Sequence, residues 1–263
     1  MKKKELVMLQ KQIKGVIVPL VTPYNLQDLP HLIDHVINGG ISNIFILGTT
    51  GEALKLKQKQ KIEIIEKASI HINQRVNLLI GISSFSLEDT FELMKISHDL
   101  KATSVIAPLV LGDPKTITQA LLKKPYGNII LYNNPKITKE KSILSDDIKP
   151  FASEKRVLGI KDSSNDFTYL EGLIKIKNDH FKIYFGGENL KEAFTRKIDG
   201  IVPGDANVDP KLFTLLWKMR EKGPWDNLKN LRKEISLENE KNYLQALKSL
   251  LKKRNLISSS LLF

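Results

Sequence analysis

Short apolar runs alternate along the chain with longer segments rich in lysine and glutamate. The apolar runs occupy residues 15–23, 43–50, 76–83, 103–110, 128–135, 157–163, 182–187 and 199–204. Continuous apolar runs of this length are typical of strands that are buried on both faces, as in parallel sheets. Parallel neighbours need a crossover connection between them, usually a helix. The pattern therefore predicts eight parallel strands that alternate with helices.

The segments between the runs have the period that such helices require. Apolar residues recur at helical spacing in residues 55–72, 87–100 and 167–177. Strands that repeat about every 25 to 30 residues favour an α/β fold of the (β/α)8 TIM barrel type. An open doubly wound sheet remains the alternative, because a count of strands does not establish that the sheet closes.

After the eighth run the pattern becomes helical throughout. The segment 243–255 carries apolar residues at helical spacing, namely Leu244, Leu247, Leu250 and Leu251. We therefore predict a barrel over residues 1–208 with a short N-terminal extension, and additional C-terminal helices over residues 209–263. This second region is expected to be abbreviated and to pack on the barrel.

Composition and charge exclude several classes of function. The chain has no cysteine, so disulfides and cysteine-ligated metals are impossible. The formal net charge of +12 suggests nucleic-acid binding, but the densest basic stretch, residues 227–255, interleaves acids with bases like a solvated helix. The apolar runs are far shorter than a membrane span. We expect a soluble cytoplasmic protein with no nucleic-acid or membrane partner.

Reactive side chains follow three of the predicted strands. The second strand ends in residues 48–52 (GTTGE), the fifth in residues 132–135 (YNNP), and the sixth in Lys161 and Asp162. The active sites of TIM barrels lie at the C-terminal ends of the strands. These residues are therefore expected to meet at one mouth of the barrel.

Each of these residues also has a simpler explanation when it is considered alone. Lys161 could reach solvent or pair with Asp162. Tyr132 could be a core tyrosine with a satisfied hydroxyl. The segment 48–52 could be a turn that leads into a helix, with Glu52 favoured by the helix dipole. Their coincidence at one end of the predicted barrel favours a chemical role.

Other catalytic motifs fail at identifiable positions. The segment after Gly48 lacks the lysine of a P-loop, and residues 81–85 (GISSF) lack the closing glycine of a nucleophile elbow. His31 and His35 could share one helix face, but Leu32 replaces the glutamate of a zinc protease motif. We expect no metal site.

A lysine amine at such a mouth has a known chemical use. Burial disfavours the charged form of an amine, and a neutral amine can attack a ketone to form a Schiff base. The resulting iminium accepts electrons, so that a neighbouring carbon-carbon bond can form or break. A tyrosine can transfer the protons, and hydroxyls with backbone amides can hold a carboxylate. No separate cofactor is needed.

The motifs LVTPYN, GTTGEALKL, LYNNP, GIKDSS and DGIVPGDANVDP occur in this order between about residues 15 and 210. Together they resemble those of the dihydrodipicolinate synthase / N-acetylneuraminate lyase family, which are pyruvate-dependent class I aldolases on a (β/α)8 barrel. The resemblance is weaker in the C-terminal helices.

The resemblance assigns a role to each matching residue. Lys161 resembles the Schiff-base lysine, and Tyr132 resembles the acid/base tyrosine. Thr49 resembles the threonine of the proton relay. The substrate-binding positions implied by the resemblance are Thr50 and Gly48 at the carboxylate-binding loop, Val202 lining the pyruvate pocket, and Gly186 in the glycine motif after strand seven.

The chain also departs from the family pattern. Relatives carry an aromatic pair after strand four, where this chain has Leu109 and Val110. The synthase branch places a carboxylate-binding arginine where this chain has Ile137, and an apolar side chain cannot replace that clamp. Lys136 or Lys139 could supply charge nearby. The chain is also expected to stop before the last helix of its relatives.

The resemblance therefore implies a Schiff-base-forming, pyruvate-dependent lyase that acts on a 2-keto acid or 2-keto-3-deoxy acid. The alternatives are a 4-hydroxy-tetrahydrodipicolinate synthase and a non-catalytic keto-acid-binding relative. The expected partners are a small-molecule substrate, pyruvate or a 2-keto acid with an aldehyde, and further copies of the chain in a homo-oligomer, either a tetramer or a dimer.

Overall fold

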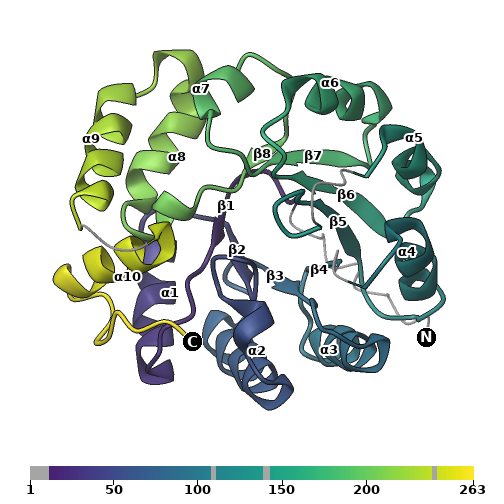
Figure 1. Ribbon diagram of the computed structural model, residues 1–263, viewed down its shortest axis with the longest axis horizontal. Helices are drawn as coiled ribbons and strands as arrows, with labels where there is room; N and C mark the ends of the chain where they lie inside the picture. Colours follow the sequence, from purple (N-terminus) through teal and green to yellow (C-terminus); the bar gives the residue numbers. More distant parts are fainter. Residues whose placement is uncertain (1–11, 108–110, 139–142, 239–241) are drawn as a thin grey trace, which may run out of the picture.

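The computed structural model describes residues 12–107, 111–138, 143–238 and 242–263. Within them, eight parallel strands pair in sequence order, and β8 pairs with β1 to close the barrel (Figure 1). The strands are β1 (Gly15–Pro19), β2 (Asn43–Ile46), β3 (Asn77–Gly81), β4 (Ser104–Ile106), β5 (Ile129–Asn133), β6 (Val157–Asp162), β7 (Lys182–Phe185) and β8 (Gly200–Ile201). The predicted TIM barrel is confirmed, and the open sheet is excluded.

Each strand is shorter than the apolar run that predicted it. The runs continue past the strands because their last residues form the loops at the barrel mouth. At the end of β2, for example, Leu47 adopts a left-handed backbone conformation with φ of 56°, which cannot continue a strand. Several of these extra residues, among them Thr49, Asn134, Ser163, Gly186 and Val202, line the candidate site.

Helices surround the barrel, as Figure 1 shows. They are α1 (Leu29–Asn38), α2 (Gln58–Ile72), α3 (Leu87–Asp99), α4 (Pro114–Leu122), α5 (Ser145–Ile148), α6 (Phe167–Ile176), α7 (Leu190–Ala193), α8 (Pro210–Met219), α9 (Trp225–Ser236) and α10 (Tyr243–Lys253). The three helices predicted between strands correspond to α2, α3 and α6. Their buried residues face the strands and form one continuous apolar core with them.

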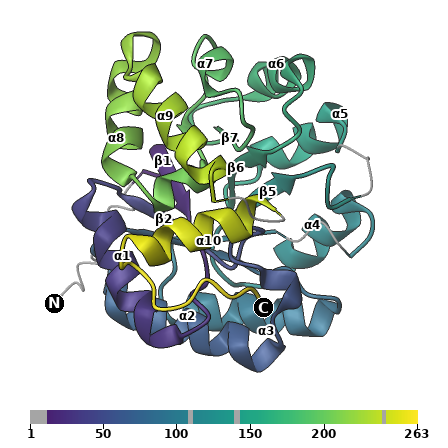
Figure 2. The ribbon, with the colours of Figure 1, turned by 60° about the vertical axis from the view of Figure 1, so that its left-hand side comes forward.

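The additional C-terminal helices predicted from the sequence are present. α8 packs against β1, while α9 and α10 continue along the same side of the molecule (Figures 1 and 2). In α10, Leu247, Leu250 and Leu251 are buried, and Leu244 is half-buried. The division of the chain at residue 208 into two folding regions stays a prediction.

One irregularity in the sheet affects the site directly. The pairing of β5 with β6 shifts between Ile129 and Ile130, so that β6 contains one extra residue, Leu158. A bulge of this kind changes which side chains face the same way beyond it. After the shift, Tyr132 pairs with Lys161 across the two strands.

Among the described residues, every helix is too short or too polar to span a membrane.

Candidate active site

Lys161 lies at the C-terminal end of β6 and lines the cavity at the barrel mouth. Its side chain is almost fully buried, and its Nζ donates a hydrogen bond of 2.6 Å to Ser163 Oγ. The same Nζ lies 3.8 Å from the centroid of the Tyr132 ring. The lysine is therefore held inside the mouth and does not reach out to bulk solvent.

Asp162 does not pair with Lys161, which removes the simpler explanation of that lysine. Successive side chains of a strand point to opposite faces. The Asp162 carboxylate instead accepts hydrogen bonds from Asn133 Nδ2 at 2.8 Å and from the Ser164 hydroxyl at 3.0 Å. Burial raises the pKa of Asp162, and the hydrogen bonds from Asn133 and Ser164 offset this in part. Asp162 thus fixes the loops after β5 and β6.

Tyr132 connects the lysine to the loop after β2. Its hydroxyl lies 3.2 Å from Thr49 Oγ1 and accepts a 2.8 Å hydrogen bond from Asn134 Nδ2. Burial alone would raise the pKa of this phenol, but the charge of Lys161 and the hydrogen bonds of Thr49 and Asn134 outweigh it. The pKa therefore lies below its ordinary value of 10.0. A phenol in this setting can both give and receive a proton.

The loop after β2 presents Thr49 and Thr50 to the mouth. Thr50 lines the large cavity beside Lys161, and Gly48 leaves no room for a side chain, since a Cβ there would lie 2.7 Å from the Phe45 ring. The structure brings both threonines to the cavity. The role of Thr50 in holding a carboxylate stays a prediction.

Glu52 does not act as the helix-dipole anion that was one explanation of this loop. It has a left-handed backbone with φ of 56°, and its buried carboxylate contacts Lys248 Nζ of α10 at 2.6 Å. Lys55 lies 3.1 Å away, and the backbone N–H of Phe263 donates a 3.1 Å hydrogen bond. Glu52 thus ties the threonine loop to the C-terminal segment.

Gly186 and Val202 complete the floor of the mouth. A Cβ at Gly186 would lie 2.5 Å from Ser163 Oγ and 2.9 Å from Lys161 Nζ, so a side chain there would occupy the space around the amine. Val202 is buried and lines the same cavity, with its N–H bonded to the Phe185 carbonyl at 2.8 Å. All seven residues predicted for the site therefore lie at one end of the barrel.

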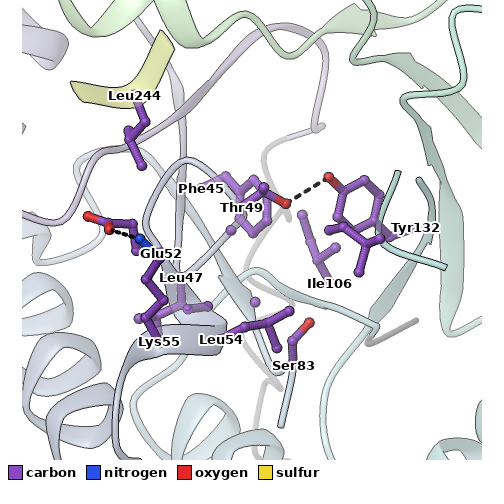
Figure 3. A pocket seen from close by; sticks show the side chains of 14 residues that line it. Phe45, Leu47, Thr49, Glu52, Leu54, Lys55, Ser83, Ile106, Tyr132 and Leu244 are labelled. Atoms are coloured by element: carbon purple, nitrogen blue, oxygen red, sulfur yellow. Dashed lines mark hydrogen bonds and ion pairs between the residues drawn. The ribbon is translucent and has the colours of Figure 1, made fainter. Parts of the chain in front are cut away.

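Two cavities share the walls formed by Phe45, Thr49 and Tyr132. The larger, of about 1000 Å³, is the mouth that contains Lys161. The smaller, of about 290 Å³, is predominantly apolar and includes Leu54, Ile106 and Leu244 (Figure 3). A dashed line in Figure 3 joins the hydroxyls of Thr49 and Tyr132, and both residues line the two cavities.

Several residues of the mouth were given no individual role by the sequence analysis. Asn134 and Ser163 belong to the quoted motifs, where their polar side chains next to Tyr132 and Lys161 were the available signal. Asp205, Arg232 and Tyr243 also line the cavity. Arg232 and Tyr243 come from the C-terminal helices, and nothing in their local sequence indicates that they reach the mouth.

Of the residues at which the chain departs from the family pattern, the structure describes Lys136 and Ile137. Leu109, Val110 and Lys139 lie outside the described residues. Ile137 lines the apolar cavity, and Lys136 lies 3.5 Å from Glu188 at the exposed rim of the mouth. In the part of the chain that the structure describes, no three histidine, aspartate or glutamate side chains gather as a possible metal site.

Comparison with known proteins identifies the family. The model of the dihydrodipicolinate synthetase family matches residues 12–259. A 4-hydroxy-tetrahydrodipicolinate synthase of Staphylococcus haemolyticus is 26% identical over 226 residues, which are 80% of this chain and 76% of the relative.

Solved structures agree with this match. Dihydrodipicolinate synthase from Bacteroides thetaiotaomicron superposes with a TM-score of 0.83 at 27% identity, covering 95% of this chain and 91% of that one. The enzyme from Acinetobacter baumannii, solved with pyruvate, gives 0.82 at 26% identity, with coverages of 96% and 92%. The chain belongs to the dihydrodipicolinate synthetase family and is an enzyme of the lyase class, of the aldolase type.

Proposed function

We propose that Lys161 forms a Schiff base with pyruvate, or with the pyruvate portion of a larger 2-keto acid. The observation that carries this proposal is the position of its Nζ, inside the mouth, 2.6 Å from Ser163 Oγ and against the face of Tyr132. The amine attacks the keto carbon and water leaves. The iminium then draws electrons from the neighbouring carbon, so that a bond to an aldehyde carbon can form or break.

In this proposal Tyr132 and Thr49 transfer the protons. Thr49 Oγ1 and Asn134 Nδ2 both contact the phenol oxygen, which holds that oxygen beside the lysine. Thr50 and the amides of its loop hold the keto-acid carboxylate, with Gly48, Gly186 and Val202 shaping the pocket. Activation by neighbouring groups of this kind contributes about 10²–10⁴-fold to rate.

The proposed reaction is the retro-aldol cleavage of a 2-keto acid or 2-keto-3-deoxy acid, or its reverse. 4-Hydroxy-tetrahydrodipicolinate synthesis is the second candidate, because curated relatives such as the Staphylococcus haemolyticus protein carry that name. Against it stands Ile137, which provides no charge where the synthase branch has its arginine. A non-catalytic keto-acid-binding relative is the third possibility.

Reductive trapping tests the Schiff base. The protein is incubated with pyruvate and borohydride, digested, and mapped by mass spectrometry. We expect a carboxyethyl group on Lys161 and none on Lys61, a second buried lysine whose Nζ donates to the Ser83 carbonyl. Lys161→Ala should abolish the adduct. An unmodified Lys161 in the native protein contradicts the proposal.

An aldehyde screen separates the remaining candidates. Turnover with pyruvate and sugar-derived aldehydes supports the aldolase, whereas turnover confined to the synthase's own aldehyde substrate supports the second candidate. Adduct formation without any turnover supports the non-catalytic relative.

We further propose that the protein works as a homo-oligomer, because members of its family are mostly tetramers. We also propose that it works in the cytoplasm. Sedimentation velocity of the native protein is expected to give a dimer or a tetramer. A single-chain species with full activity would exclude an oligomeric requirement.

A further inference from the structure

Asn134 directly follows β5 and carries an amide that reaches the phenol of Tyr132. Its Nδ2 donates a 2.8 Å hydrogen bond to the Tyr132 hydroxyl oxygen, and its side chain is buried in the wall of the mouth. Its backbone carbonyl accepts hydrogen bonds from the N–H groups of Ile137 at 2.9 Å and Thr138 at 3.1 Å, in the turn that follows the strand. The amide therefore approaches the phenol from a backbone that is itself fixed.

Two consecutive asparagines stand at this strand end, and they use their amides differently. Asn133 uses both ends, because Nδ2 donates to Asp162 Oδ1 at 2.8 Å and Oδ1 accepts from the Ile143 N–H at 3.2 Å. Asn134 uses Nδ2 for the phenol, whereas its buried Oδ1 has no hydrogen-bond partner among the residues that the structure describes. A buried unpaired oxygen costs stability, so an asparagine that only holds the fold normally pairs both ends. The contacts of Asn134 thus favour a role at the phenol over a role in holding the fold.

The amide determines the direction in which the phenol proton points. An amide nitrogen donates and does not accept, so the phenol oxygen is the acceptor toward Asn134. The proton of the neutral phenol is then left for Thr49 Oγ1, 3.2 Å away (Figure 3). When the phenol loses that proton, the Thr49 hydroxyl can turn and donate instead. The hydrogen bond from Asn134 is present in both states and is stronger in the charged one.

The charged groups around Tyr132 do not duplicate this contribution. Lys161 on β6 is the cation beside the ring, with its Nζ 3.8 Å from the ring centroid. Asp162 and Glu52, the acids of the neighbouring strand and loop, are both bound by other partners. Burial would raise the pKa of Tyr132, but the charge of Lys161 together with the hydrogen bonds to the phenol oxygen lowers the pKa below its ordinary value of 10.0. Replacing Asn134 leaves Lys161 in place and so isolates one hydrogen bond.

We propose that Asn134 is a positioning residue of the proton transfer, which holds the Tyr132 hydroxyl oxygen and stabilises the phenolate that forms during the reaction. The inference rests on the proposed Schiff-base function. Asn134 acts through the phenol oxygen, whereas Lys161 and Tyr132 act on the substrate.

The phenolate has a place in each proposed step. When the iminium forms on Lys161, Tyr132 gives its proton to the hydroxyl that leaves the former keto carbon as water, and a phenolate remains beside the iminium. In cleavage, the phenolate takes the proton of the hydroxyl on the carbon that becomes the aldehyde. The electrons of the breaking carbon-carbon bond move into the iminium and give an enamine. A donor at the phenol oxygen therefore stabilises the state between the two proton transfers.

Two variants of Asn134 should shift the phenol in graded steps. Asn134→Leu removes the donor at similar size, and Asn134→Asp replaces it at the same shape with a carboxylate that repels the phenolate. The Tyr132 titration, followed by tyrosinate absorbance without substrate and with the Tyr132→Phe signal subtracted, should move to higher pH in Asn134→Leu and further in Asn134→Asp. Loss of a charge-assisted hydrogen bond should lower kcat of Asn134→Leu by about 10- to 100-fold. An unchanged titration in both variants would overturn the proposal.

Urea unfolding separates this role from a structural one. Asn134→Leu removes a buried unpaired oxygen and leaves Thr49 as a partner of the phenol, so its unfolding midpoint should be unchanged or higher. Asn133→Leu removes an amide that is bonded at both ends, and its midpoint should fall. Equal losses of stability in the two variants would indicate a structural role for Asn134 and contradict the inference.

A double variant tests whether the amide acts through the phenol. Tyr132→Phe with Asn134→Leu should have the kcat of Tyr132→Phe alone within about twofold, because no phenol oxygen remains for the amide to hold. A further loss as large as that of Asn134→Leu alone would refute this route. Pyruvate trapping on Lys161 is run to completion in parallel: a missing adduct in the native protein contradicts the proposed function, whereas a normal adduct with native kcat in Asn134→Leu contradicts the role of Asn134 alone.

Discussion

At the residue scale, the surroundings of the Tyr132 hydroxyl distinguish its pKa from those of three other buried or half-buried tyrosines. The charge of Lys161 acts against the burial that would raise the phenol pKa, and the net result is a pKa below 10.0. The pKa values of Tyr169, Tyr184 and Tyr243 are all raised, chiefly by burial. Tyr132 should therefore ionise before these three tyrosines as pH rises.

We expect turnover to fall on the alkaline side as Tyr132 loses its proton, because the phenolate can no longer act as an acid. Tyr132→Phe should lower kcat by about 10²–10³-fold and remove that alkaline limb. Lys161→Ala should move the Tyr132 ionisation to higher pH, since burial then acts without the opposing charge. Tyrosinate absorbance of each variant, compared with Tyr132→Phe, measures the shift. An unchanged titration in Lys161→Ala contradicts the coupling.

Gly186 offers a second test at this scale. In Gly186→Ala the new Cβ would lie 2.9 Å from Lys161 Nζ, so the amine or the loop must move. Displacement of a reacting group by about 1 Å can cost about 100-fold in rate. We expect pyruvate trapping to slow by that order.

Gly172→Ala is the matched control for that change. In α6 its Cβ would come no nearer than 3.7 Å to Ser145, an ordinary contact, and alanine favours a helix by about 0.5–1 kcal/mol over glycine. The control should therefore trap pyruvate normally and unfold at slightly higher denaturant concentration. Equal trapping rates in both variants would show that the space at Gly186 is not needed.

At the scale of elements, a buried ion pair joins the loop after β2 to α10. Lys248 Nζ is fully buried and bonds both to Glu52 at 2.6 Å and to the Leu261 carbonyl at 3.0 Å. Burial lowers the pKa of Lys248, and Glu52 opposes that change. Because Glu52 lies two residues after Thr50 in the same loop, α10 supports the loop that carries Thr49 and Thr50.

Removing one member of this pair should be costly. Lys248→Met leaves the buried Glu52 carboxylate without its nearest cation, and breaking such pairs costs about 3–5 kcal/mol in unfolding free energy. The double variant Glu52→Gln with Lys248→Met should recover part of this loss. Lys252→Met, at an exposed position of the same helix, should change stability by less than about 0.5 kcal/mol. Urea unfolding measures all three variants, and equal losses for Lys248→Met and Lys252→Met would contradict this account.

The elements were predictable because their signals are local. The eight apolar runs indicated eight strands, and the helical spacing indicated α2, α3, α6 and α10. Strand ends were not predictable, because the same apolar residues continue into the mouth loops. The bulge in β6 also has no local signal, since it depends on how β6 pairs with β5.

At the scale of the whole molecule, the strand-end part of the site was predictable and the covering part was not. Residues at strand ends converge by the geometry of the closed barrel, so motif order was sufficient for Lys161, Tyr132 and Thr49. Arg232 and Lys248 come from helices more than forty positions beyond the residues they contact, Glu188 and Glu52. Their approach depends on how α9 and α10 pack on the barrel, which helical periodicity alone does not determine.

The net charge of +12 is also a property of the whole molecule. Like charges repel across a compact protein and salt screens this repulsion, so low ionic strength should destabilise the fold. We expect the thermal unfolding midpoint to rise by about 2–4 °C between low and moderate salt, which corresponds to about 1 kcal/mol for a chain of this size.

Charge reversal at one exposed position should reproduce part of that effect. Lys211 lies in the first turn of α8, where the helix dipole favours an acid. Lys211→Glu should therefore raise the midpoint at low salt, and Lys211→Gln should raise it about half as much, because it removes one positive charge and adds no negative one. Both gains should shrink as salt is added, since both are electrostatic. Gains that persist undiminished at high salt would point to helix propensity as their source, and repulsion among the lysines would then not limit the stability of this barrel.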